Sequence, residues 1–172
     1  MIIMSILVVY ESMFGDARDI AQAIAAGAAE SVPATAVEVS EAPDAIPDDV
    51  TLLVVGTPTH AFGLPRPGTR SDAAQRADTP LVSTGRGVRE WLAVITPARK
   101  GQPAVTFDTR MTQPKLVTAM DHASHTSAKL LRKSGFAIAT ESEHFHVLDV
   151  QGPLADGESE RARDWGRQLA GI

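Results

Sequence analysis

Apolar runs alternate with amphipathic segments along most of the chain. Residues 4–10 and 50–56 are continuous apolar runs, which are typical of strands that are buried on both faces. Shorter stretches with alternating or apolar character add further strand candidates. Strands are predicted at residues 4–10, 35–39, 50–56 and 103–109, with two strand-like pieces at 136–140 and 145–150.

Helical periodicity fills the segments between most of these strands. In residues 16–32 one face carries four apolar residues, Ile20, Ala23, Ile24 and Ala28. Asp16 stands at the start of this segment, where an aspartate is a good N-cap. Residues 87–95 place Val88, Trp91, Leu92 and Ile95 on one helical face. Further helices are predicted within 115–135, closed by Gly135, and over 157–172.

The order of these elements predicts a parallel sheet with helices on both of its faces. Residues 40–49 are too short and too rich in proline to form a good crossover helix, so we expect a single turn there. Residues 57–87 are rich in Pro, Gly, Thr and Arg and read as a long loop, which is usually functional or mobile. No repeat or linker interrupts the pattern, and we expect one domain over residues 1–172.

Composition narrows the classes of function. The 172 residues carry a formal net charge of −5, which argues against a general nucleic-acid surface. The absence of cysteine excludes a disulfide, a thiolate nucleophile and iron–sulfur ligation by this chain. The apolar N-terminus lacks the basic region and cleavage site of a signal peptide and is too short to span a membrane. A cytoplasmic protein with no membrane partner is therefore the expectation.

Three unusual loops follow predicted strands and are expected to meet at one edge of the sheet. They are "ESMFGDA" (11–17), "TPTHAFG" (57–63) and "DTRMTQP" (108–114). In an open parallel sheet, ligands bind beyond the carboxyl ends of the strands, at the point where the strand order reverses. These loops are therefore predicted to form one binding crevice.

The order of "ILVVYESMFGDARDIAQAIA", "LLVVGTPTHAFGLPRP", "GVREWL", "AVTFDTR" and "GPLADGESERARDWGRQLA" resembles the bacterial flavodoxin-like family over nearly the whole chain. The resemblance implies an α/β three-layer sandwich with a five-stranded parallel sheet in the order 2-1-3-4-5. It also implies the short-chain form, without a long insertion in the last strand. The usual ligand of this family is FMN, held without a covalent bond.

The family's phosphate loop, S/T-x-T-G-x-T, corresponds to Ser12–Ala17. Ser12 and Gly15 match the pattern, whereas Phe14 and Ala17 replace residues with hydroxyl groups. Backbone N–H groups at a helix N-terminus can still bind an anion. Glu11 and Asp16, however, bring negative charge to the place where a phosphate would bind.

Two interpretations of the loop therefore stay open: a working phosphate site, or a helix start capped by Asp16. Arg18, or an arginine between residues 66 and 89, would compensate for the added charge in the first case. A working phosphate site would bind FMN, whereas a loop that serves only as a capped helix start would bind FMN weakly or not at all.

The resemblance also assigns roles to the other two loops. His60 and Phe62 are the candidates for contact with a flavin ring, although Phe62 could instead cover the core. Arg66 and Arg70 suit an anion but could equally lie in solvent. Asp108 could cap or brace its loop. The predicted cofactor-binding residues are Ser12, Met13, Phe14, Gly15, Asp16, Ala17, Pro58, Thr59, His60, Ala61, Phe62, Gly63, Asp108, Thr109 and Arg110.

Other candidate chemistry is sparse. His122 and His125 are three residues apart on a predicted helix, and His144 and His146 are two apart on a predicted strand. Each spacing could place both imidazoles on one face, but no third ligand accompanies either pair, so no metal site is predicted. Trp91 and Trp165 lie on apolar helical faces and are predicted to be core residues. No catalytic acid, base or nucleophile can be identified.

Two hypotheses for function follow. The first is a flavodoxin-like flavoprotein and oxidoreductase that binds FMN and transfers electrons from a partner protein or a nicotinamide donor, or reduces a small quinone-type substrate. The second is a cofactor-free binding or regulatory module with the same fold. The altered phosphate loop favours the second hypothesis, and Ser12, Gly15 and "PTHAFG" favour the first.

Overall fold

The fold is described from a computed structural model, over residues 4–59, 64–77, 80–112 and 123–172. The strands of these segments form one sheet, in which β2, β1, β3, β4 and β5 are successive neighbours and β6 also pairs with β4. All neighbouring strands in it are parallel. The strands are β1 (Ser5–Tyr10), β2 (Ala34–Glu38), β3 (Val50–Pro58), β4 (Pro103–Met111), β5 (Ala137–Ile138) and β6 (Glu143–Val147). The predicted α/β fold with sheet order 2-1-3-4-5 is confirmed.

The fifth position of the sheet is divided between two short strands. β5 pairs with the start of β4, where Ala104 faces Ile138, and β6 pairs with its end, where Phe107 faces Glu143. Three steps along β4 thus correspond to five steps along its partner, so two extra residues bulge out of the ladder. The hydroxyl groups of Thr106 and Ser142 meet at 2.6 Å beside this bulge.

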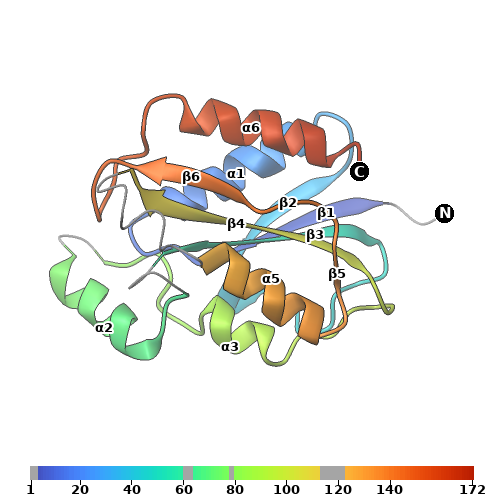
Figure 1. Cartoon of the computed structure of the whole chain (residues 1–172), viewed down its shortest axis with the longest axis horizontal. Coiled ribbons are helices and arrows are strands. Elements are labelled where there is room, and N and C mark those ends of the chain that lie inside the picture. The colour runs from blue at the N-terminus through green and yellow to red at the C-terminus, as the bar shows by residue number, and fades with distance from the viewer. Residues whose placement is uncertain (1–3, 60–63, 78–79, 113–122) are drawn as a thin grey trace.

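Helices cover both faces of the sheet (Figure 1). One face carries α1 (Asp16–Ala28) and α6 (Glu158–Leu169), and the other carries α3 (Val88–Leu92) and α5 (Ala123–Lys133). A core layer lies on each face, and Trp165 belongs to the first layer and Trp91 to the second. Both tryptophans are buried, as predicted. Ile20, Ile24 and Ala28 of α1 are fully buried, and Ala23 is partly buried, as the periodicity predicts.

The helices α1 and α6 cross so closely that no side chain fits between their backbones at two positions. A Cβ atom on Gly27 would lie 2.0 Å from the carbonyl oxygen of Arg163, and one on Gly166 would lie 2.1 Å from that of Ile24. Real Cβ atoms do not approach backbone so closely, so both positions require glycine at this crossing. The sequence pattern gives no hint of this contact.

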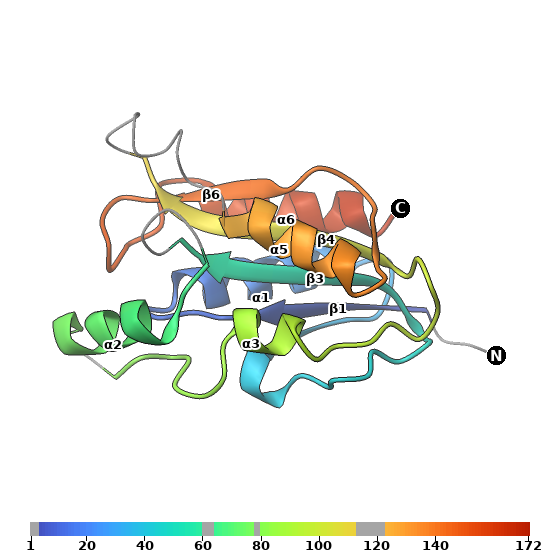
Figure 2. The same cartoon turned by 60° about the horizontal axis from the view of Figure 1, so that its bottom comes forward.

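The long segment after β3 contains regular structure, which corrects the prediction of a structureless loop. Residues Pro67–Arg76 form the helix α2, with proline at its first position and the hydroxyl of Thr69 accepting a hydrogen bond from the N–H of Arg66. This helix lies at the end of the sheet where the strands terminate (Figure 2). Between β2 and β3, only one 3₁₀ turn, η1 (Val39–Glu41), replaces a crossover helix, as predicted.

The described helices are all too short or too polar to cross a lipid bilayer.

Candidate functional site

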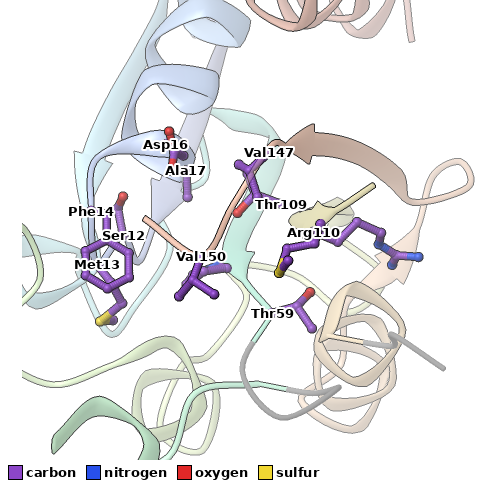
Figure 3. A pocket seen from close by; sticks show the side chains of 12 residues that line it. Ser12, Met13, Phe14, Asp16, Ala17, Thr59, Thr109, Arg110, Val147 and Val150 are labelled. Carbon is purple, nitrogen blue, oxygen red and sulfur yellow. The ribbon is translucent and has the colours of Figure 1, made fainter. Parts of the chain in front are cut away.

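A small cavity of about 90 Å³ lies beyond the carboxyl ends of β1, β3 and β4 (Figure 3). All three loops that were predicted to form the crevice contribute to it, in so far as the structure describes them. The lining residues are Ser12, Met13, Phe14, Asp16, Ala17, Pro58, Thr59, Thr109, Arg110, Met111, Val147 and Val150. Nine of the predicted cofactor-binding residues are therefore brought together. His60, Ala61, Phe62 and Gly63 lie outside the described residues.

The loop after β1 has the backbone shape of an anion-binding turn, but part of it is already hydrogen-bonded. Gly15 adopts a left-handed conformation with φ 101° and precedes α1 as its N-cap residue. The N–H of Gly15 donates to Ser12 Oγ at 3.1 Å, and the N–H of Ser12 donates to Ser83 Oγ at 2.9 Å. Val82 and Ser83 donate in turn to the carbonyls of Met13 and Ser12. The hydrogen bonds from residues 82–83 thus hold the loop in place and form a brace for it.

Asp16 is not the N-cap of α1, which corrects the capping interpretation. It is the first residue of the helix, and no side chain caps this end of α1 with a hydrogen bond. Its carboxylate faces Gly152, because a Cβ atom on that glycine would lie 2.8 Å from each carboxylate oxygen. Burial and the charge of Asp19 raise the pKa of Asp16 to about 6, and Arg18 only partly opposes them. The carboxylate therefore stands in the cavity wall with little compensation.

Glu11 has a different role from the one that its sequence position suggests. It is fully buried but is not part of the cavity wall. Its carboxylate accepts hydrogen bonds from Arg70 Nε at 2.8 Å and from the N–H of Val88 at 2.7 Å. Burial raises the pKa of Glu11, while the hydrogen bonds from Arg70 and Val88 oppose that rise. Glu11 is thus an internal anchor for the chain after β3.

Arg70 is the other half of this anchor. Its guanidinium also contacts the carboxylate of Glu90, with Nη1 2.5 Å from Oε1, and donates to the carbonyl of Pro65. It is therefore neither an anion-binding arginine nor a freely solvated one, as the sequence had left open. A Cβ atom on Gly87 would lie 1.8 Å from Arg70 Nη2, so only glycine leaves room for this ion cluster. The cluster fastens α2 to the edge of the crevice.

Asp108 organises the opposite wall. It is fully buried and accepts two hydrogen bonds from Arg110, at 2.9 and 2.7 Å, one from the N–H of Ser124 at 3.0 Å, and faces His144 Nδ1 at 3.0 Å. Burial opposes ionisation, but the contacts with His144 and Arg110 outweigh it and lower the pKa of Asp108 to about 2. Of the two roles predicted for Asp108, bracing its surroundings is the one found.

The cavity suits one end of the flavin that the resemblance implies better than the other. The neutral ring of a flavin would find suitable partners. Thr59 Oγ1 is buried and has no hydrogen-bond partner among the described residues, and the walls formed by Phe14, Val147 and Val150 are apolar. The phosphate end does not fit in the same way. Phe14 and Ala17 offer no hydroxyl groups, Asp16 adds a negative charge, and the guanidinium of Arg110 points away from Asp16 (Figure 3).

Sequence reasoning missed two lining residues and one polar cluster. Val147 and Val150 line the cavity and come from the distant end of the chain, whereas Met111 belongs to a loop that was predicted to form the crevice. The link between Asp108 and His144 also joins two strands far apart in sequence. The alternation along β4 could have placed Asp108 and Arg110 on one face, but nothing in the sequence pairs them with residue 144.

The histidines do not assemble a metal site in the part of the chain that the structure describes. His144 faces Asp108, whereas His146 lies 3.5 Å from a different carboxylate, that of Glu158. No group of three potential ligands gathers among the described residues. His122 lies outside them.

Comparison with known proteins agrees with this geometry. The family model described as "Flavodoxin" matches residues 8–88, a segment that includes the end of β1, the loop after it and the segment between β3 and α3. No curated protein matches the chain in sequence.

Solved structures share the fold over the whole chain at low sequence identity. An archaeal flavodoxin is 15% identical with a TM-score of 0.62, and the match covers 98% of this chain and 97% of that one. A flavodoxin of Streptococcus pneumonia TIGR4 is 16% identical with a TM-score of 0.62, over 97% and 98% of the two chains. A short-chain flavodoxin associated with a bacterial microcompartment is 17% identical with a TM-score of 0.59, over 98% of each chain. At these identities the likeness concerns the fold.

Proposed function

We propose that this chain, which resembles flavodoxins in its fold and in sequence over residues 8–88, is a redox protein that binds a flavin without a covalent bond in the crevice beyond β1, β3 and β4. The observation that carries the proposal is the cavity itself, which residues of three predicted loops line, among them Thr59, whose buried hydroxyl has no hydrogen-bond partner among the described residues. FMN is the ligand that the family resemblance implies. When bound, the flavin supplies the electron-transfer chemistry, which needs no catalytic acid or base from the protein.

In this proposal the protein's own residues bind and orient the ligand. The backbone of Ser12–Ala17 holds the sugar-chain end, and the first turn of α1 offers N–H groups that no side chain caps. Thr59 Oγ1 donates to a polar edge of the ligand, and Thr109–Met111 lie along the other side. Ligand pockets usually measure about 300–1,000 Å³, so the cavity of about 90 Å³ must widen to admit a ring system.

The proposed role in the cell is electron transfer from a partner protein or a nicotinamide donor, or reduction of a small quinone-type substrate, in the cytoplasm. Val150 lines the cavity, and its side chain and that of Leu148 are exposed, so a partner that docks here would contact apolar groups beside a bound flavin. The alternative is a cofactor-free binding or regulatory module. Phe14, Asp16 and Ala17 favour that alternative, because none of them supplies a donor to a phosphate.

Absorption spectroscopy tests the proposal. The freshly purified protein, or the protein after incubation with excess flavin and gel filtration, is expected to show the visible and near-ultraviolet bands of a bound flavin. Val150→Asp places a charge in the apolar wall and should reduce flavin retention at least about tenfold. Leu148→Asp is the matched control, because Leu148 is 56% exposed, comparable to the 60% of Val150, but is not in the cavity wall.

A colourless protein that retains no flavin under these conditions contradicts the proposal and supports the cofactor-free alternative. Equal loss of flavin in both variants would show that the cavity is not the binding site.

A further inference from the structure

The end of the crevice at α1 is closed by a carboxylate. Asp16 is the first residue of α1 and lines the cavity beside Ser12 and Ala17 (Figure 3). Gly152 lies directly against both of its carboxylate oxygens. A ligand that enters between the loop of Ser12–Ala17 and segment 147–152 therefore meets Asp16 with its terminal group.

The charged groups near Asp16 do not neutralise it. On its own helix, Arg18 is bound to Asp19, with Arg18 Nε 3.1 Å from Asp19 Oδ1, and lies over Gly15. From β4, Arg110 is held by the buried carboxylate of Asp108 through two hydrogen bonds. No described basic side chain forms an ion pair with Asp16. Helix α1 itself favours negative charge at this end, and Asp16 already supplies it.

The other side chains at this end of the cavity offer few donors to a phosphate group. Phe14 and Ala17 have no hydrogen-bonding atoms in their side chains, so the hydroxyl of Ser12, which accepts a hydrogen bond from the N–H of Gly15, is the one side-chain hydroxyl that the loop of Ser12–Ala17 provides. The N–H of Ser12 is engaged with Ser83. A phosphate monoester carries about −1.5 to −2 charges near neutral pH, and placing it beside a half-buried carboxylate is strongly unfavourable. A neutral hydroxyl in the same place could donate a hydrogen bond to that carboxylate.

We propose that this crevice selects a flavin whose side chain ends in a neutral hydroxyl group, such as riboflavin, over the phosphorylated form FMN, and that Asp16 is the residue that determines this specificity. The inference rests on the proposed flavin-binding function. The inference concerns the group at the end of the flavin's side chain, whereas the proposed function concerns the binding of its ring. The fold is then that of a flavodoxin, with the preference for a phosphate reversed.

Equilibrium titrations followed by quenching of flavin fluorescence test the inference. The wild-type protein is titrated with riboflavin and, separately, with FMN at the same neutral pH and salt concentration. The expected Kd for FMN is at least about tenfold higher than the Kd for riboflavin. Asp16→Asn removes the charge while keeping the size of the side chain, and should lower the Kd for FMN and raise that for riboflavin, so that their ratio falls at least about fivefold.

Asp19→Asn is the matched control. Asp19 lies one helical turn further along α1, is half exposed and does not line the cavity. Its substitution removes the same formal charge outside the cavity wall, and it should change the ratio of the two Kd values much less than Asp16→Asn does, although it also removes the partner of Arg18 and the charge that raises the pKa of Asp16. Thermal unfolding of both variants verifies that they are folded.

The outcomes separate this inference from the proposal on which it rests. If the wild-type protein binds FMN more tightly than riboflavin, the selectivity inference is wrong and the flavin-binding function stands. If Asp19→Asn changes the ratio as much as Asp16→Asn, the role of Asp16 is wrong. If neither wild type nor Asp16→Asn binds either flavin, both the function and the inference are overturned.

Discussion

At the scale of single residues, Asp108 shows how one buried carboxylate can hold a binding wall together. It satisfies Arg110 of its own strand, the first turn of α5 through Ser124, and His144 of β6. Because Arg110 is itself buried, its cation depends on this carboxylate for compensation. The polar wall of the crevice is therefore a stability element as well as a candidate binding surface.

Asp108→Asn should destabilise the protein by about 3 kcal/mol at neutral pH, because a buried guanidinium loses its anionic partner. The pKa of Asp108 in the folded protein is about 2, below its ordinary value of 3.8. The stabilisation is therefore complete above the ordinary pKa and is lost as the pH falls towards 2, to the extent of about 2 kcal/mol. Urea unfolding over this acidic range should show a weaker pH dependence for the variant than for wild type.

Asp48→Asn is the control for this comparison. Asp48 also pairs with an arginine, Arg99, at 2.9 Å, but both side chains are about half exposed or more. Exposed pairs contribute about 0–1 kcal/mol, so its loss should be small. Equal destabilisation by the two substitutions would contradict the role given to Asp108.

At the scale of elements, the crossing of α1 and α6 brings the backbones of two helices into direct contact. Gly27 and Gly166 allow the backbones to meet where any side chain would collide with a carbonyl oxygen. This crossing fixes α1 against the sheet, and α1 in turn carries the loop of Ser12–Ala17 at its start. The position of the crevice thus depends on two glycines that are distant from it.

Gly166→Ala should lower the free energy of unfolding by at least about 2 kcal/mol, since the added Cβ overpacks a rigid backbone contact. Helix propensity alone would favour alanine by about 1 kcal/mol, so the sign of the change distinguishes packing from propensity. Gly68→Ala is the matched control, because Gly68 is also helical but a Cβ there meets nothing within 4 Å. Chemical denaturation should show stabilisation or no change for Gly68→Ala, and a stable Gly166→Ala would refute the close crossing.

At the scale of the whole molecule, two core layers share one set of strands. Val8 and Val54 belong to one layer, while their neighbours Val9 and Val55 belong to the other. Since alternate residues of the same strand enter opposite layers, neither layer can come apart without the sheet that supports the other. The molecule should unfold as one cooperative unit.

The two tryptophans report on the two layers separately. The chain has only Trp91 and Trp165, one in each layer. In the single-tryptophan variants Trp91→Phe and Trp165→Phe, urea unfolding followed by fluorescence should coincide with unfolding followed by circular dichroism. A fluorescence transition that precedes the circular dichroism transition in either variant would show that one layer opens first.

The sequence predicts much of the sheet and little of the crevice's internal bonding. Local periodicity is sufficient to find β1, β3, β4 and α1, because each buries a regular apolar pattern against the core. It fails for α2, whose residues bury few apolar groups and whose position depends on the ion pair of Arg70 with Glu11. It also assigns Glu11 to a phosphate site, since a sequence does not reveal which of two neighbouring carboxylates turns inward. Contacts between residues distant in the chain carry no periodic signal.

The brace beneath the crevice also determines when the crevice can form. The hydrogen bond between Ser12 and Ser83 spans 71 residues, and that between Glu11 and Val88 spans 77. During synthesis, β1 and the loop after it leave the ribosome well before these partners exist, and closing such long spans is slow. A nascent chain that ends before residue 83 already contains Arg70, but it lacks Ser83 and Val88, which bind the backbone of the loop and the carboxylate of Glu11. Ligand binding at this crevice therefore requires a chain that extends past α3 for its brace and past Val150 for its wall, and the binding site matures later than the strand that carries it.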